Sequence, residues 1–195
     1  EKTKEDYVQM RAYIMVCKCI DSQGDSVTGY SEKIELLEKA RKEVSVEYNI
    51  GILEQLGQVY SDMGNETDDV SYYEKAAEVF RQICKQGMGS YDTSYNLAVL
   101  YQNMGKFSEA SSLLKQMLEQ HGENYKTYKA LAFLEAAEQE KMDISQRNYT
   151  GFCDYYKKAK NLYEQQLKNN ANDMEMDKLE ELYGQAVSNG WITGE

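Results

Sequence analysis

Proline is absent from this chain of 195 residues. Proline is common in loops and turns, so its absence, together with abundant Ala, Leu, Glu, Lys, Gln and Met, favours helices throughout. Hydrophobic residues make up 42% of the chain and charged residues 28%, which is the ordinary balance of a protein with a buried core. The sequence therefore predicts a folded, all-α protein.

Histidine and cysteine are scarce. His121 is the single histidine and has no neighbours at metal-ligand spacing, so neither a Ser-His-Asp arrangement nor a metal site is expected. No glycine-rich phosphate loop is present. Four cysteines form no CxxC pair: Cys17, Cys19, Cys84 and Cys153. We therefore expect no enzymatic activity and no cofactor. This cysteine usage favours a reducing compartment, the cytoplasm, unless the chain is cut from a membrane-anchored parent.

Long apolar runs are also missing, and the charge is strongly negative. The longest apolar run, Tyr13 to Cys17, is far too short to cross a bilayer, so no direct membrane insertion is expected. The formal net charge is −11, whereas a nucleic-acid partner requires a basic stripe that contacts phosphates. The richest basic stretch, residues 157–160, lies beside acidic residues and has the pattern of a solvated helix face. We therefore expect no nucleic-acid partner.

One sequence pattern occurs three times. The clearest copy, residues 96–110, has Leu-Ala three residues before Tyr, followed by Gly, an aromatic residue and Ala. An earlier copy begins at 56–64 and resumes at 73–83, and a third uses residues 131–132 and 156–163. Small residues recur at matching positions of the copies. These residues are Gly57, Ala76, Ala98, Ala110, Ala132 and Ala159.

The repeated pattern resembles the tetratricopeptide repeat, a pair of antiparallel helices of about 34 residues. The resemblance implies that the small residues lie where the two helices of a pair cross, because larger side chains there would force the helices apart. The resemblance implies an all-α, right-handed α-α superhelix, a solenoid of about nine helices. It also implies that Tyr60 and Tyr101 pack between one pair and the next, and that Gly64 and Gly105 end the first helix of their pairs. The proline that usually closes each repeat is missing from every copy.

We interpret residues 1–195 as one repeat domain. The best-matching repeat is 91–124, and the repeat before it, 50–90, carries about seven extra residues around 65–71. The repeat at 125–173 carries about fifteen extra residues around 140–150. Both insertions fall between the two helices of a pair.

The two ends of the chain complete the predicted stack. Residues 1–49 form a degenerate pair, with one helix over 6–20, a break at 21–28, and a second helix over 31–44 capped by Ser31. The apolar side of the first helix consists of Val8, Tyr13, Met15, Val16 and Cys19. Residues 174–190 form a capping helix that covers the last repeat. Its apolar positions are Leu179, Leu182, Tyr183 and Ala186.

The resemblance implies a concave surface, lined by the first helix of each pair, that seats an extended or helical peptide. Periodicity gives the inward-facing positions outside the core. The predicted peptide-binding residues are Glu54, Gln58 and Asp62 in the first copy, Tyr95, Asn96, Val99, Gln102 and Asn103 in the second, and Lys126, Lys129 and Phe133 in the third. The amides suit hydrogen bonds to a ligand backbone, and the aromatic rings suit side-chain anchors. The alternative is that these positions are solvated faces of a structural stack.

The carboxylate clamp of tetratricopeptide co-chaperones is not expected here. Its Lys, Asn and Arg pattern is matched only at Asn96 and Lys126. Glu54 and Ala130 stand where basic residues are needed, and Gln58 replaces an Asn. The acidic residues instead favour a basic or neutral ligand.

The leading hypothesis is a scaffold that binds a peptide or a partner protein, within a larger, bacterial signalling or assembly protein. One alternative is self-association through Tyr-rich faces or the N-terminal end, giving a homodimer. Another is the regulatory tetratricopeptide region of a bacterial serine/threonine kinase. Both rest on analogy with the fold alone.

Overall fold

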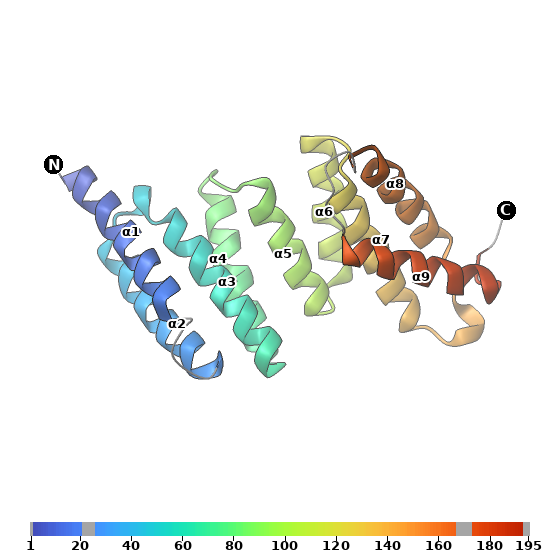
Figure 1. Cartoon of the computed structure of the whole chain (residues 1–195), viewed down its shortest axis with the longest axis horizontal. Helices are drawn as coiled ribbons and strands as arrows, with labels where there is room; N and C mark the ends of the chain where they lie inside the picture. Colours follow the sequence, from blue (N-terminus) through green and yellow to red (C-terminus); the bar gives the residue numbers. More distant parts are fainter. Residues whose placement is uncertain (1, 21–25, 167–172, 193–195) are drawn as a thin grey trace. The chain divides into compact units, whose positions relative to one another are not determined.

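The computed structural model describes residues 2–20, 26–166 and 173–192. Over these residues the chain has nine α-helices, two short 3-10 turns and no strand, so the predicted all-α class is confirmed. The helices form two compact units, unit 1 up to Gly105 and unit 2 from Lys106 onward (Figure 1).

Unit 1 is a set of helices packed in chain order. Each of its helices contacts the next, and α1 also contacts α3. A 3-10 turn at Val46–Tyr48 precedes α3. The helices are α1 (Lys2–Ile20), α2 (Ser26–Glu43), α3 (Ile50–Thr67), α4 (Val70–Lys85) and α5 (Tyr91–Asn103). This succession of neighbouring helices is the arrangement that the repeat pattern predicts.

Unit 2 repeats this arrangement. Here α6 contacts α7, α7 contacts α8, and α9 lies against both α7 and α8. A 3-10 turn at Ile144–Gln146 lies between α7 and α8. The helices are α6 (Phe107–His121), α7 (Tyr125–Glu140), α8 (Thr150–Gln166) and α9 (Met174–Ser188).

The six small residues that recur in the sequence pattern lie at packed positions, and Gly57 lies where α3 crosses α4. All six are buried. At Gly57 a Cβ atom would lie 2.8 Å from the ring of Phe80, so only glycine allows α3 to approach α4 this closely. Tyr60 then packs between helices, because its ring stacks on Tyr72 of α4 and its hydroxyl donates to Glu38 of α2 at 3.2 Å.

The two predicted helix-ending glycines differ. Gly105 follows α5 with a φ of 69°, as predicted. The prediction for Gly64 is wrong, because α3 continues past it to Thr67 and ends at Asp68, which has a left-handed φ of 53°. The close packing of α4 requires a glycine at position 64, since a Cβ there would lie 2.6 Å from the ring of Tyr73. It therefore adds a second crossing point between α3 and α4.

The two insertions are accommodated differently. In the first, α3 and α4 are both longer than α5 and α6, and only Asp68 and Asp69 separate α3 from α4. Asp69 caps α4 by accepting a hydrogen bond from the Ser71 amide at 2.9 Å. The second insertion forms a longer connection between α7 and α8, which contains the 3-10 turn.

The predicted buried side of α1 is wrong. Val8, Met15 and Val16 are 58%, 64% and 51% exposed. Over residues 4–20 of α1, the buried residues are Asp6 and Cys17. This helix has apolar residues on opposite sides, so its periodicity does not by itself identify the packed side.

The start of α2 also differs from the prediction. The helix begins at Ser26, so residues 26–28 are helical instead of part of a break, while residues 21–25 lie outside the described part of the chain. Ser31 is not a cap. Its hydroxyl donates to the Val27 carbonyl at 3.0 Å from inside the helix.

Helix α9 covers unit 2 through aromatic and apolar contacts. Leu179 and Ala186 are buried, and Tyr183 stacks on Tyr156 of α8 with the ring centroids 4.9 Å apart. After α9, Trp191 stacks on Tyr149 at 5.3 Å, and its carbonyl accepts a hydrogen bond from the Tyr149 amide at 2.9 Å. These contacts hold α9 along α8.

Candidate peptide-binding surface

The predicted peptide-binding residues fall into three rows on three helices. Two rows lie in unit 1, on helices that both pack against α4. The third row lies in unit 2 on α7. The α3 row is Glu54, Gln58 and Asp62; the α5 row is Tyr95, Asn96, Val99, Gln102 and Asn103; the α7 row is Lys126, Lys129 and Phe133.

The α3 row follows one side of its helix at intervals of four residues, opposite buried residues such as Leu56. Gln58 is exposed, and Glu54 and Asp62 are half-buried. The side-chain amide of Gln58 donates to Asp62 Oδ1 at 2.8 Å. The row therefore presents two carboxylates with a fixed amide between them, an arrangement suited to basic groups or backbone N–H donors.

The α5 row begins at a well-defined helix start. Ser90 and Thr93 form a reciprocal capping box, in which the Thr93 amide donates to Ser90 Oγ at 3.1 Å. At this helix start, the rings of Tyr91 and Tyr95 stack with centroids 6.1 Å apart and planes 18° apart. This stack gives the row a rigid apolar edge.

The rest of the α5 row is amide-rich. Asn96, Val99 and Gln102 are half-buried and Asn103 is exposed, while Leu97 on the other side is in the core. Asparagine and glutamine side chains carry both donors and acceptors, so they can pair with the backbone of an extended peptide. The row combines these amides with the tyrosine stack.

Sequence reasoning missed Tyr91 as a member of this surface. It lies one turn before Tyr95, and aromatic residues four apart on a helix are neighbours. The four-residue spacing of Tyr91 and Tyr95 could therefore have placed Tyr91 on this surface from the sequence alone.

In the α7 row, Lys129 does not point to solvent. Its side chain is 7% exposed, and its Nζ lies 2.7 Å from Asp173 Oδ2 and 2.6 Å from Glu175 Oε2. Lys126 is exposed and Phe133 is half-buried. The start of α9 therefore occupies the position in which Lys129 would meet a ligand, and we leave Lys129 out of the proposed surface.

The charges around Lys129 are matched. Burial by itself would raise the pKa of Asp173, but the hydrogen bond and positive charge of Lys129, together with the backbone amides of Glu175 and Met176, hold that pKa below its ordinary value of 3.8. Asp173 also accepts a hydrogen bond from the Glu175 amide at 3.0 Å and so caps α9. The Lys129 contact is a structural ion pair within unit 2.

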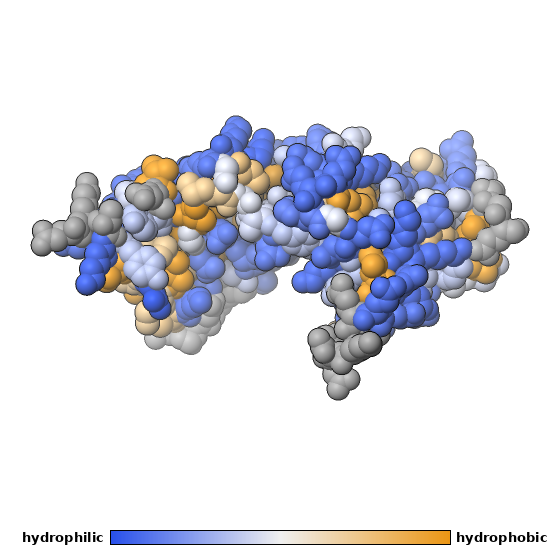
Figure 2. Space-filling view, turned by 90° about the horizontal axis from the view of Figure 1, so that it is seen from above, coloured by the Kyte–Doolittle hydropathy of each residue, from blue (hydrophilic) through white to orange (hydrophobic). Residues whose placement is uncertain are grey.

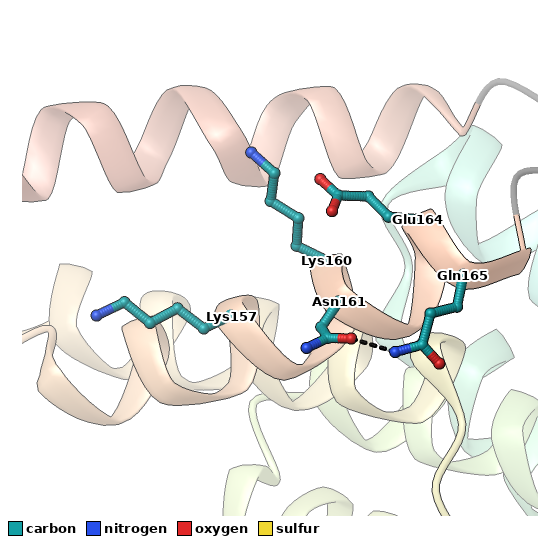
Figure 3. A pocket seen from close by; sticks show the side chains of 5 residues that line it. All are labelled: Lys157, Lys160, Asn161, Glu164 and Gln165. Atoms are coloured by element: carbon teal, nitrogen blue, oxygen red, sulfur yellow. Dashed lines mark hydrogen bonds between the residues drawn. The ribbon is translucent and has the colours of Figure 1, made fainter.

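A surface pocket of about 470 Å³ runs along α8 (Figure 3). Its lining residues all come from this one helix: Lys157, Lys160, Asn161, Glu164 and Gln165. Lys160 reaches toward α9, where its Nζ lies 2.7 Å from Glu180 Oε1, and Gln165 donates to Asn161. The hydrogen bond to Glu180 raises the pKa of Lys160. Lys160 is thus drawn to Glu180 and Asn161 to Gln165, so these groups do not converge on a ligand position.

Within the described residues, His, Cys, Asp and Glu side chains nowhere gather in threes or more as a metal site requires. Among the same residues, the helices are too short or too polar for any of them to traverse a bilayer.

The tetratricopeptide repeat family matches residues 50–87 and, separately, residues 73–132. Residues 50–132 therefore match the tetratricopeptide repeat family, the family that the repeated sequence pattern resembles. A solved structure of MamA AMB-1 is similar in fold, with a TM-score of 0.54 and 18% sequence identity over 88% of this chain and 92% of that one. A search of curated proteins gives no match. The repeats support a protein-interaction scaffold in general terms.

Proposed function

We propose that the chain is a protein-binding scaffold whose α3 and α5 rows bind a peptide or a peptide-like segment of a partner protein. The observation that carries this proposal is the Tyr91–Tyr95 stack beside a row of half-buried amides that the core does not use. Rigid aromatic anchors next to adaptable hydrogen-bonding groups are typical of binding surfaces.

The chemistry of the rows favours a basic or neutral ligand. Glu54 and Asp62 supply negative charge on α3, and no residue of the two rows is basic. Asn96 and Gln102 supply donors and acceptors for a ligand backbone, and Tyr95 supplies a ring for an apolar side chain. A free C-terminal carboxylate would meet the carboxylates of the α3 row and is disfavoured.

The experiment is a peptide array followed by affinity measurements on the peptides that bind. Tyr95→Ala and Asn96→Ala are expected to weaken binding about tenfold or more each, because truncated anchors and unpaired amides lose over 1 kcal/mol. Gln116→Ala, an exposed amide on α6, is the matched control and is expected to leave affinity unchanged. Unchanged binding by both row variants would reject this surface.

The scaffold is proposed to act as part of a signalling or assembly protein. The competing proposal, a self-association module, predicts a molecular mass that rises with concentration in light scattering. Peptide binding by a strictly monomeric chain would favour the scaffold over that alternative.

A further inference from the structure

Helix α1 carries a second apolar face, opposite the face that packs in unit 1. This outer stripe consists of Val8, Ala12, Met15, Val16 and Cys19, all exposed. Val8, Ala12, Met15 and Cys19 are spaced by four, three and four residues, which is the spacing of a coiled-coil seam. Figure 2 shows hydrophobic side chains at the surface of the end of unit 1 that contains α1.

The inner face of α1 accounts for its packing without the outer stripe. Met10 and Ile14 pack against Gly51 of α3. A Cβ atom added to Gly51 would lie 3.1 Å from the Met10 side chain and 3.2 Å from that of Ile14. Tyr13 and Gln9 donate hydrogen bonds to Glu43 of α2. The outer stripe therefore contributes little to unit 1, and a continuous exposed apolar stripe is a feature of interaction sites.

A line of basic residues runs along one flank of the outer stripe. Lys4, Arg11 and Lys18 are exposed and follow one another at intervals of seven residues, so they lie in a row on the same side of α1. The Arg11 guanidinium lies 5.9 Å from the centre of the Tyr7 ring, beside this row. Such a row stands out in a chain with a net charge of −11.

We propose that the outer stripe of α1 docks an amphipathic helix of a partner protein, in coiled-coil fashion, and that acidic side chains of that helix face the basic row. In coiled coils the residues that flank the apolar seam pair across the interface and set partner choice. Because Lys4, Arg11 and Lys18 are seven residues apart, acidic residues at the same interval on the partner helix would face all three.

A second copy of α1 does not supply those acids. In an antiparallel pair about the centre of the stripe, Arg11 would face Lys18 of the other copy. In a parallel pair, the basic row would face Gln9 and Val16, neither of which is acidic. Self-pairing of α1 therefore leaves the cations without partners or opposed to one another.

An anionic membrane matches the stripe less well than a helix. Helices that lie in a membrane surface carry large apolar groups such as Trp, Phe and Leu and are basic on their polar face. The outer stripe has Val, Ala, Met and Cys with Glu5 at its edge. The strongly acidic chain would also be repelled by anionic lipid.

The test uses two labelled helical peptides of three heptads, with Leu at the seam and either Glu or Lys at every flanking position. Fluorescence anisotropy with the full chain is expected to show at least tenfold tighter binding of the Glu peptide. Met15→Lys is expected to weaken that binding tenfold or more. Arg11→Glu combined with Lys18→Glu is expected to reverse the preference between the peptides.

Two controls match these changes on exposed sites elsewhere. Met174→Lys removes an apolar side chain that is 73% exposed, and Lys115→Glu combined with Lys178→Glu reverses two exposed charges. Both controls are expected to leave binding within twofold, and circular dichroism checks that each variant keeps its helical content.

Several results would overturn the proposal. Equal affinity for the two peptides, or no binding of either, would show that the basic row selects no acidic helix. Dimerisation of the chain that Met15→Lys abolishes would assign the stripe to a second copy. Binding to phosphatidylserine vesicles that Met15→Lys abolishes, with no peptide preference, would assign it to a membrane.

Discussion

Lys129 Nζ on α7 lies 2.7 Å from Oδ2 of Asp173, the residue that caps α9. The lysine side chain is 7% exposed and that of Asp173 is 17% exposed, so the pair is largely shielded from water. This contact ties the start of α9 to α7 and removes a predicted ligand-binding lysine from the surface.

Replacing Lys129 by Ala should lower the free energy of unfolding by about 1 to 3 kcal/mol, because a shielded carboxylate loses its hydrogen-bond partner. Urea unfolding followed by circular dichroism measures the change. Lys126→Ala, three residues earlier on the same helix but exposed, is the matched control and should change stability by about 0.5 kcal/mol or less. Equal effects of the two variants would contradict a structural role for Lys129.

The ion pair also predicts an acid-sensitive component of stability. The pKa of Asp173 is lower in the folded chain than its ordinary value of 3.8, so its contribution is fully present above that value and is lost as the pH falls through the folded pKa. Asp173→Asn keeps a capping side chain but removes the charge. Urea midpoints measured from pH 6 down to pH 3 should fall less steeply for this variant than for the natural chain. Parallel curves would contradict the assignment.

Two helical glycines should respond to alanine in opposite directions. A Cβ on Gly64 would lie 2.6 Å from the ring of buried Tyr73, whereas a Cβ on Gly184 would meet nothing within 4 Å. We expect Gly64→Ala to destabilise the chain by about 1 kcal/mol or more, since overpacking outweighs the gain in helix propensity. Gly184→Ala should stabilise it by up to about 1 kcal/mol. Thermal unfolding of the two variants beside the natural chain measures both changes in stability.

Buried tyrosines predict a loss of stability in alkali. Burial, and then the nearby charge of Glu38, raises the pKa of Tyr60 to about 12 from 10.0. A pKa that is higher in the folded state gives stability that is full below pH 10 and falls as the pH rises toward 12. In Tyr60→Phe, which keeps the ring, the unfolding free energy should decline less steeply over this interval. The ultraviolet absorbance of tyrosinate would follow the titration directly.

The sequence predicted the middle of the chain well because the local signals there agree. In α5, the helix begins at Tyr91, where the best-matching repeat was predicted to begin, Ala98 is buried, and Gly105 follows the end as expected. Helix starts and crossings depend on a few residues and their near neighbours, so a single sequence reveals them.

Features set by distant parts of the chain were harder to predict. Gly64 looks like a helix-ending glycine until the ring of Tyr73 is placed against it. The outward direction of Val8 and Met15 depends on where α2 and α3 lie. Lys129 looks like a surface residue until the start of α9 is brought to it from forty-four positions away. Packing decides each case, and periodicity within one helix does not contain that information.

The first insertion also bears on how such a pair can change length. An α-helix turns once in about 3.6 residues, so seven residues make almost two whole turns. Gly64 lies seven positions after Gly57 and therefore faces α4 on the same side of α3. The extra residues are divided between the end of α3 and the start of α4, on either side of Asp68 and Asp69, so each helix is lengthened by about one turn and the glycines still face Tyr73 and Phe80. Length variation in such helix pairs should therefore come in about one turn on each helix, about seven residues for the pair, wherever the insertion stays helical.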